Sequence, residues 1–158
     1  NGINVAIETC GYANYETFTD CLDYIDFIYF DIKHMDSGKH QAITGRGNEK
    51  ILANLEKINQ HGTEIHVRTP VVPGYNDGRE NILATAAFCG KLSNVTKYEL
   101  LAYHKLGINK YKVLGLDYPL ADIIEPTTEK MDTLKDAANE ILRPSGKVCI
   151  YNKDNNFD

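Results

Sequence analysis

Four short segments of this sequence gather charged and polar side chains that could bind a small polar ligand. Each segment lies at the end of an apolar or alternating run, and the residues are Glu8, Asp31, Lys33, Arg68 and His104. Carboxylates accept hydrogen bonds from ligand hydroxyls, and two of them together can hold a cation. Lysine and arginine suit a ligand carboxylate or phosphate, and an imidazole can hydrogen-bond to a base or stack on it. These residue types favour a site for an anionic or polar small molecule.

The hydrophobic pattern predicts the elements that must position these residues. Apolar alternation and apolar runs predict strands over residues 3–9, 27–31, 65–72 and 97–103, and the pattern at 147–151 is compatible with a short final strand. Helical spacing predicts helices over 18–25, 49–60, 77–91 and 127–142, with a long loop over 104–126. This order indicates an α/β fold with about four parallel strands and flanking helices. Periodicity leaves open whether the sheet is open or part of a barrel, but in both cases ligands bind at the carboxyl ends of the strands.

Several local signals refine these elements. Asn48 is expected to cap the helix that starts at residue 49, and Asp77 with Glu80 resembles a capping box. Cys21 and Cys89 lie on apolar helix faces and are expected in the core. No two of the four cysteines form a C-x-x-C pair, so neither a zinc ribbon nor a local iron–sulfur site is encoded, and the pattern fits a reduced cytoplasm.

The composition is that of one ordinary globular domain. The chain has 158 residues, of which 42% are hydrophobic and 25% are charged, so we expect one domain over residues 1–151 and a polar tail over 152–158. The net charge of −5 and the scattered basic residues argue against nucleic acid as a partner. No apolar run reaches the ~20 residues that a membrane span needs. Because the chain starts Asn1-Gly2 directly before a strand-like run, we expect an excised piece of a longer protein.

Each candidate residue also has a purely structural interpretation. Asp31 and Lys33 could form a local ion pair at a strand end, and Arg68 could bridge Asp31 or Glu8. His104 could cap the turn that follows it, and Thr9 could simply start a turn. A different chemistry is a Schiff base on Lys33, but this needs a desolvated, neutral lysine, whereas Asp31 on the same face would keep it charged. A non-catalytic binding or scaffold domain also remains open.

Three longer sequence motifs resemble those of a known protein family. They are FDIKHMD at residues 30–36, VRTPVVPGYND at 67–77 and ELLAYHKLG at 99–107. In order and spacing they resemble the radical S-adenosylmethionine (SAM) enzymes that activate glycyl radical enzymes, of the pyruvate formate-lyase activating type. With the smaller matches around them, the resemblance extends over residues 8–118.

The resemblance implies a fold and a reaction. The fold is a partial (β/α) barrel of the radical SAM type, of which this chain would form the C-terminal portion. A [4Fe–4S] cluster, held by a C-x-x-x-C-x-x-C loop, cleaves SAM reductively, and the resulting 5′-deoxyadenosyl radical takes a hydrogen atom from a glycine of a partner enzyme. No such loop occurs in this sequence. The resemblance therefore places the cluster ligands outside this segment, and the segment alone is expected to be inactive.

The resemblance also assigns roles to individual residues. Asp31 and Lys33 would lie beside the amino-acid and ribose portions of SAM, with Lys33 facing the carboxylate. Arg68 would lie near the ribose and carboxylate, and His104 near the adenosine. No residue of this segment would be catalytic itself.

A monovalent cation is implied beside SAM in at least some members of the family. Glu8 and Thr9 match an Asp-Thr pair that holds this cation together with the residue at Asp31. Glu8 replaces the usual aspartate, so a longer side chain must reach the same ion.

Partners follow from the same resemblance. They are a glycyl radical enzyme as protein substrate and an electron donor such as flavodoxin or ferredoxin, in the cytoplasm. In isolation, the segment would expose a strand edge and an apolar half-barrel interior, so we expect it to self-associate.

Overall fold

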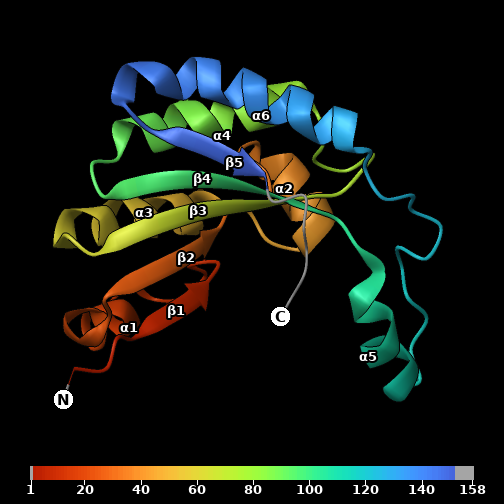
Figure 1. The fold of residues 1–158 in the computed structure, drawn as a ribbon. Coiled ribbons are helices and arrows are strands. Elements are labelled where there is room, and N and C mark those ends of the chain that lie inside the picture. The colour runs from red at the N-terminus through yellow and green to blue at the C-terminus, as the bar shows by residue number, and fades with distance from the viewer. Residues whose placement is uncertain (1, 152–158) are drawn as a thin grey trace.

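The computed structural model describes residues 2–151, and its centre is a parallel sheet of five strands in the order β1-β2-β3-β4-β5 (Figure 1). The strands are β1 (Ala6–Thr9), β2 (Phe27–Asp31), β3 (Glu64–Val71), β4 (Val95–Ala102) and β5 (Val148–Tyr151). The predicted α/β class and parallel strands are confirmed. The expected number of about four strands is corrected to five, because the short run at the C-terminus pairs with β4. The tail predicted over 152–158 lies outside the described residues.

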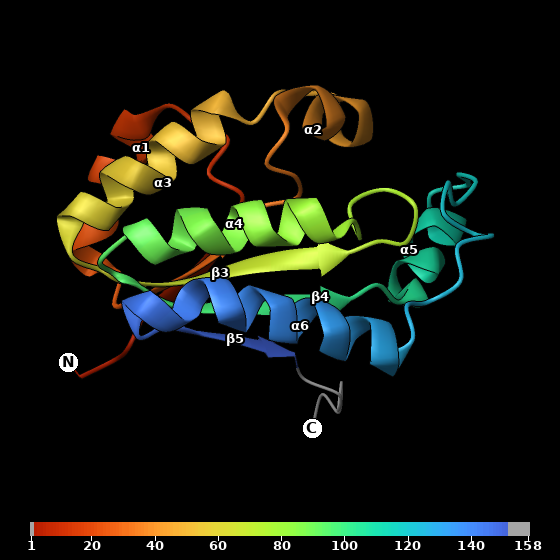
Figure 2. The same cartoon turned by 90° about the horizontal axis from the view of Figure 1, so that it is seen from above.

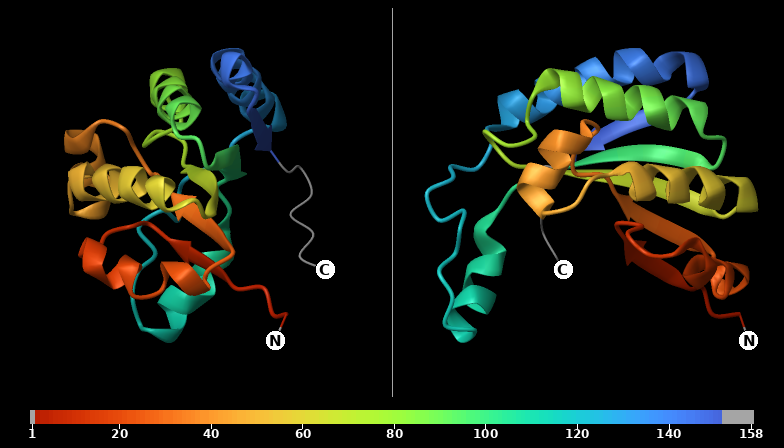
Figure 3. Two further views of the ribbon diagram at one scale, coloured as in Figure 1. Left: turned by 90° about the vertical axis from the view of Figure 1, so that its left-hand side faces the viewer. Right: turned by 180° about the vertical axis from the view of Figure 1, so that it is seen from behind.

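The main helices cover the outer, convex face of this sheet. They are α1 (Tyr15–Thr19), α3 (Glu49–His61), α4 (Arg79–Lys91) and α6 (Thr128–Leu142). Seen from above, α4 and α6 lie side by side, and α4 contacts β4 (Figure 2). Viewed from the side in the left panel of Figure 3, the helices follow the outside of a curved sheet. None of the helices within residues 2–151 is long and apolar enough to cross a membrane.

Alternate side chains along each strand point either into the core or onto the concave face of the sheet. On β2, Ile28 and Phe30 are fully buried under the helices, whereas Phe27, Tyr29 and Asp31 are only half-buried on the other side. The same alternation runs along β3. Successive strand residues point to opposite faces, so the concave face receives the charged residues while the convex face receives the apolar core.

Two smaller helices lie at the carboxyl ends of the strands. They are α2 (Ser37–Thr44) after β2 and α5 (Ile108–Val113) after β4. The prediction of a continuous loop over 104–126 is therefore wrong, since a 3₁₀ turn (Lys105–Gly107) and α5 occupy part of it. The helix expected over 18–25 is also divided, into α1 and a 3₁₀ turn (Leu22–Tyr24). Such short helices do not complete enough turns to show a periodic pattern.

Neither predicted cap on the central helices forms its side-chain bond, although Asn48 does occupy the N-cap position of α3. Asn48 makes no capping bond, because its side-chain amide donates instead to the carbonyls of His34 and Met35, each at 2.8 Å. Asp77 makes no capping box, because α4 starts only at Arg79 and Asp77 accepts from the Gly74 amide at 2.9 Å. Both polar residues thus hold loops rather than helix ends.

The two cysteines expected in the core differ in how deeply they are buried. Cys89 on α4 is fully buried, as predicted, whereas Cys21 between α1 and the following 3₁₀ turn is only half-buried. The division of the predicted 18–25 helix at this point explains the difference.

Candidate functional site

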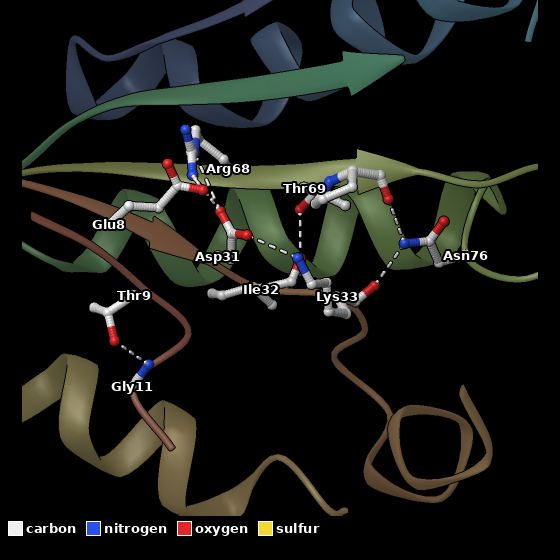
Figure 4. A network of polar contacts seen from close by, with 10 residues as sticks. Glu8, Thr9, Gly11, Asp31, Ile32, Lys33, Arg68, Thr69 and Asn76 are labelled. Carbon is white, nitrogen blue, oxygen red and sulfur yellow. Dashed lines mark hydrogen bonds and ion pairs between the residues drawn. The ribbon is translucent and has the colours of Figure 1, made fainter. Parts of the chain in front are cut away.

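Charged residues from adjacent strands meet on the concave face, near the carboxyl ends of the strands (Figure 4). The register places Asp31 of β2 beside Arg68 of β3, and Arg68 beside Glu99 of β4. Glu8 of β1 reaches the same guanidinium. The prediction that strand order would bring these residues to one rim is confirmed for the three strands that carry Glu8, Asp31 and Arg68.

Arg68 is the centre of this cluster. Its Nη2 lies 2.5 Å from Glu8 Oε1 and 3.0 Å from Asp31 Oδ1, and its Nε donates to the same Asp31 oxygen at 3.1 Å. The guanidinium also lies over the Tyr29 ring, 4.8 Å from its centroid. Burial acts to lower the pKa of Arg68, but the bonds and charges of Glu8 and Asp31 outweigh it and raise the pKa. The structural bridge considered for Arg68 is therefore present.

Lys33 completes the cluster at the end of β2. Its Nζ donates to Asp31 Oδ2 at 2.7 Å, so the local ion pair considered for these two residues is present as well. Asp31 is nearly buried, whereas about a third of the Lys33 side chain is exposed. An ammonium group has three N–H donors. Lys33 can therefore keep its bond to Asp31 and also donate to a ligand carboxylate.

Two predicted site residues make only local contacts. Thr9 Oγ1 accepts from the Gly11 amide at 3.0 Å, so it starts a turn (Figure 4). His104 Nδ1 accepts from the Leu106 amide at 3.4 Å, as expected of a residue that caps its following turn. Among residues 2–151, no hydrogen bond or ion pair joins either side chain to Asp31.

The cation expected at Glu8 and Asp31 stays a prediction. The Arg68 guanidinium contacts both carboxylates. Within the described part of the chain, no group of three or more His, Cys, Asp or Glu side chains could hold a metal ion. In the present arrangement, the charge that balances the two carboxylates comes from the protein itself.

The cysteines of the described residues do not fit an iron–sulfur cluster. Cluster ligands are thiolates. Cys89 and Cys149 are both buried, and burial raises the pKa of each thiol to about 12. Cys10 is exposed and Cys21 is half-buried.

Glu99 belongs to the cluster and was not singled out from the sequence. It lies beside Arg68 in the sheet, and burial raises the pKa of its carboxyl, an effect that Arg68 and Lys97 partly offset. The sequence does place Glu99 on the same face of a predicted strand as Lys97, two residues earlier. However, the face of the sheet toward which a charged residue in the middle of a strand points is known only once the neighbouring strands are placed.

A cavity of about 400 Å³ opens beside Lys33. It is lined mainly by apolar and aromatic side chains from α2, from the segment after β3 and from the region of α5, and these include Ile43, Val72, Tyr75, Tyr111, Tyr118 and Leu120. The exposed side of Lys33 therefore faces a space large enough for part of a small-molecule ligand.

His66 lies on the same face of β3 as Arg68 but two residues earlier. Its ring packs edge-on against Phe27 and Tyr29, with centroids 4.3 Å and 5.8 Å away. Its Nε2 is 3.4 Å from Glu64, yet this buried nitrogen forms no hydrogen bond. Burial, helped by Lys97, lowers the pKa of His66. Burial therefore favours the neutral form of His66.

We expect the free energy of unfolding to decrease as the pH falls below 6.5, the ordinary pKa of histidine. Over the range from 6.5 down to the lower pKa of the folded state, the unfolded chain binds more protons, so acid favours unfolding. Urea denaturation of a His66→Phe variant between about pH 7.5 and 5.5 should show a flatter pH dependence. His61→Phe, at an exposed helix end, is the control. A slope unchanged by His66→Phe would contradict this prediction.

Comparisons with known proteins agree with this fold. The sequence profile of the Radical SAM superfamily matches residues 1–86. The isethionate sulfite-lyase activating enzyme of Oleidesulfovibrio alaskensis is 40% identical over 124 residues, which are 77% of this chain and 40% of that protein. The pyruvate formate-lyase-activating enzyme of Clostridium pasteurianum is 39% identical over 141 residues, which are 89% of this chain and 59% of that protein. A crystal structure of a domain of pyruvate-formate lyase-activating enzyme from Bacteroides vulgatus has a TM-score of 0.73 at 24% identity, over 96% of this chain and 82% of that one.

The fold and the matched residues define the class, and this chain belongs to the radical SAM superfamily. Within that superfamily, it is similar to activating enzymes of pyruvate formate-lyase and isethionate sulfite-lyase. The resemblance based on residues 30–36, 67–77 and 99–107 is thus confirmed, as is the partial barrel. The chain spans 40% of the length of the first relative and 59% of the second.

Proposed function

We propose that this chain forms the SAM-binding, C-terminal part of an activating enzyme that removes a hydrogen atom from a glycine of a partner glycyl radical enzyme. The observation that carries the proposal is the joining of Glu8, Asp31, Lys33 and Arg68 at the carboxyl ends of three adjacent strands. In parallel α/β folds, this end of the sheet is the ligand-binding end. The membership in the radical SAM superfamily supports SAM as this ligand.

The charges at the rim suit the chemistry of SAM. Its carboxylate needs a cation, which the part-exposed ammonium of Lys33 offers beside the cavity. Its ribose hydroxyls need acceptors and donors, which Asp31 and Arg68 offer. His104, at the end of β4, would lie on the adenosine side, and Thr9 with Glu8 would border the site at β1. A monovalent cation held by Glu8 and Asp31 remains part of this proposal.

The residues of this chain would bind and orient rather than react. Lys33 fixes the amino-acid end of the ligand, while the Arg68 bridge keeps Asp31 in place. The apolar cavity wall excludes water from the bound ligand. When bound, SAM and a [4Fe–4S] cluster held by another part of the protein would supply the radical chemistry. A flavodoxin or ferredoxin in the cytoplasm would supply the electron.

The Schiff-base alternative fits the geometry less well. Lys33 is paired with Asp31 at 2.7 Å and is partly exposed, whereas a nucleophilic lysine must be neutral. No borohydride trapping of a carbonyl substrate on Lys33 is therefore expected.

The function is tested with the complete reading frame that contains this segment. The protein is purified without oxygen, reconstituted with iron and sulfide, and given reductant and SAM. The proposal expects 5′-deoxyadenosine, and expects none from residues 1–158 alone. A complete protein that binds iron but forms no 5′-deoxyadenosine would contradict the activating role. A complete protein that binds no iron would favour the scaffold interpretation.

We expect residues 1–158 alone to self-associate. Within the described residues, β1 is an edge strand, and Ile3 and Val5 just before it are 76% and 40% exposed. An exposed apolar edge promotes pairing between chains, and an edge lysine opposes it. Sedimentation velocity should show mass increasing with concentration, less so in an Ile3→Lys, Val5→Lys double variant. A wild-type monomer at high concentration would be evidence against this.

A further inference from the structure

The loop that carries Lys33 is held by side chains that donate to four successive main-chain carbonyls. Thr69 Oγ1 donates to the Ile32 carbonyl at 2.9 Å, and Asn76 Nδ2 donates to the Lys33 carbonyl at 2.9 Å (Figure 4). The next two carbonyls in the chain, of residues 34 and 35, both accept from Asn48 Nδ2 at 2.8 Å. Every carbonyl from residue 32 to residue 35 is thus bonded to a side chain from elsewhere in the chain.

The three donors come from different elements, and all are buried. Thr69 on β3 is 0% exposed, while Asn76 before α4 and Asn48 before α3 are each 3% exposed. Further bonds hold the donors themselves. Tyr98 donates to Thr69 Oγ1 at 3.0 Å, and Asn76 also accepts from the Val72 amide and donates to the Pro70 carbonyl, both at 2.7 Å.

This arrangement has a physical consequence for Lys33. Beyond the end of a strand, the ladder of the sheet no longer fixes the main chain, and a buried carbonyl needs another donor. Hydrogen bonds from three different elements hold the main chain of this loop in one conformation. The Lys33 side chain, although a third exposed and flexible by nature, therefore starts from a fixed main-chain position beside Asp31.

We propose that Thr69, Asn76 and Asn48 are positioning residues that fix the main chain of residues 32–35 and thereby direct the Lys33 ammonium toward the carboxylate of the ligand. A group held in place before binding loses less freedom on binding, so the ligand binds more tightly. The identity of that ligand as SAM rests on the proposed function. The fixing of the loop does not depend on it.

The test compares two pairs of variants of the complete, reconstituted protein. Thr69→Val keeps the shape and removes the bond to Ile32 together with the acceptor for Tyr98. Its comparison is Tyr98→Phe, which removes the bond from Tyr98 to Thr69 but leaves the bond from Thr69 to Ile32 in place. Asn76→Ala releases the Lys33 carbonyl. Its control is Asn139→Ala, which loses the two bonds that Asn139 makes with the Cys149 main chain. None of these variants changes the net charge, and Thr69→Ser should restore the wild-type behaviour.

Two measurements are made on each variant, with stability checked by denaturation. Hydrogen–deuterium exchange of peptides covering residues 32–36 reports on the loop without any ligand. Calorimetric titration with SAM reports on binding. We expect Thr69→Val and Asn76→Ala to speed exchange in this loop beyond the effect of global destabilisation and to weaken SAM binding about tenfold or more. Asn139→Ala should do neither, and Tyr98→Phe should have a smaller effect on both than Thr69→Val.

The outcomes separate the two proposals. Equal exchange in the variants and their controls, or faster exchange with unchanged SAM affinity, would overturn the positioning role. If the wild-type protein binds no SAM, the proposed function fails, and the exchange data alone then decide whether these side chains fix the loop that carries Lys33.

Discussion

Replacing Lys33 with alanine is expected to weaken the binding of SAM to the complete protein by about 10- to 100-fold and to reduce 5′-deoxyadenosine formation in parallel. The reason is that Lys33 is the part-exposed cation that borders the cavity at the rim, with its ammonium already oriented by Asp31. A charge-assisted hydrogen bond to a carboxylate is stronger than a neutral one, and its loss leaves the carboxylate uncompensated. Calorimetric titration measures the affinity, and chromatography measures the product.

A nearby lysine provides the control for this change. Lys39 lies in the first turn of α2 and is exposed, and its main-chain amide, rather than its side chain, donates to Asp36. Lys39→Ala removes the same charge a few residues away, so it should leave SAM affinity within about twofold. Equal losses from both variants would mean that only the overall charge of the rim matters. An unchanged affinity in Lys33→Ala would remove Lys33 from the proposed site.

Replacing Arg68 with methionine is expected to lower the free energy of unfolding by about 3 kcal/mol. Arg68 and Asp31 are both largely buried, with 12% and 14% of their side chains exposed, and the change removes both bonds that Arg68 donates to Asp31 Oδ1. Glu8 contributes little to this loss, since 65% of its side chain is exposed. Denaturant unfolding of the wild type and the variant measures the difference.

A double-mutant cycle attributes this loss to the ion pair. Asp31→Asn removes the charge that Arg68 balances, so Arg68→Met should cost at least about 1 kcal/mol less in that background. Strictly additive losses would show that Arg68 stabilises the fold by packing on Tyr29 instead. A loss below about 0.5 kcal/mol in the single variant would contradict the central position given to Arg68.

Much of the fold could be predicted from local pattern. The strand at 27–31 was located from its continuous apolar run, and the strand predicted over 65–72 agrees with β3, Glu64–Val71, to within one residue at each end. A pattern of this kind depends only on near neighbours in the chain. The short α5 and the division near Cys21 were missed because a helix of one or two turns leaves no periodic signal.

The site could be predicted in part. Residue types at strand ends identified Asp31, Lys33 and Arg68, because parallel strands bring their carboxyl ends to one edge. The sequence left open which carboxylate pairs with which cation, and the structure shows that Arg68 bridges Glu8 and Asp31 while Lys33 pairs with Asp31. The Arg68 bridge and the Asp31–Lys33 pair would hold the site ready for a ligand.

The buried asparagines show most clearly what local sequence patterns do not predict. Asn48 was expected to cap a helix and Asn76 had no expected role, yet both bind the loop after β2. Asn76 and Lys33 are 43 residues apart in the chain. Contacts between residues so far apart in the chain arise from the way the strands pack, so no local spacing in the sequence predicts them.

The most direct test of the account is a crystal structure of the complete, reconstituted protein grown without oxygen in the presence of SAM. The account predicts the SAM carboxylate within hydrogen-bonding distance of Lys33 Nζ, the ribose beside Asp31 and Arg68, and the loop of residues 32–35 in the geometry described above. SAM bound away from this rim, with Lys33 still paired only with Asp31, would contradict it.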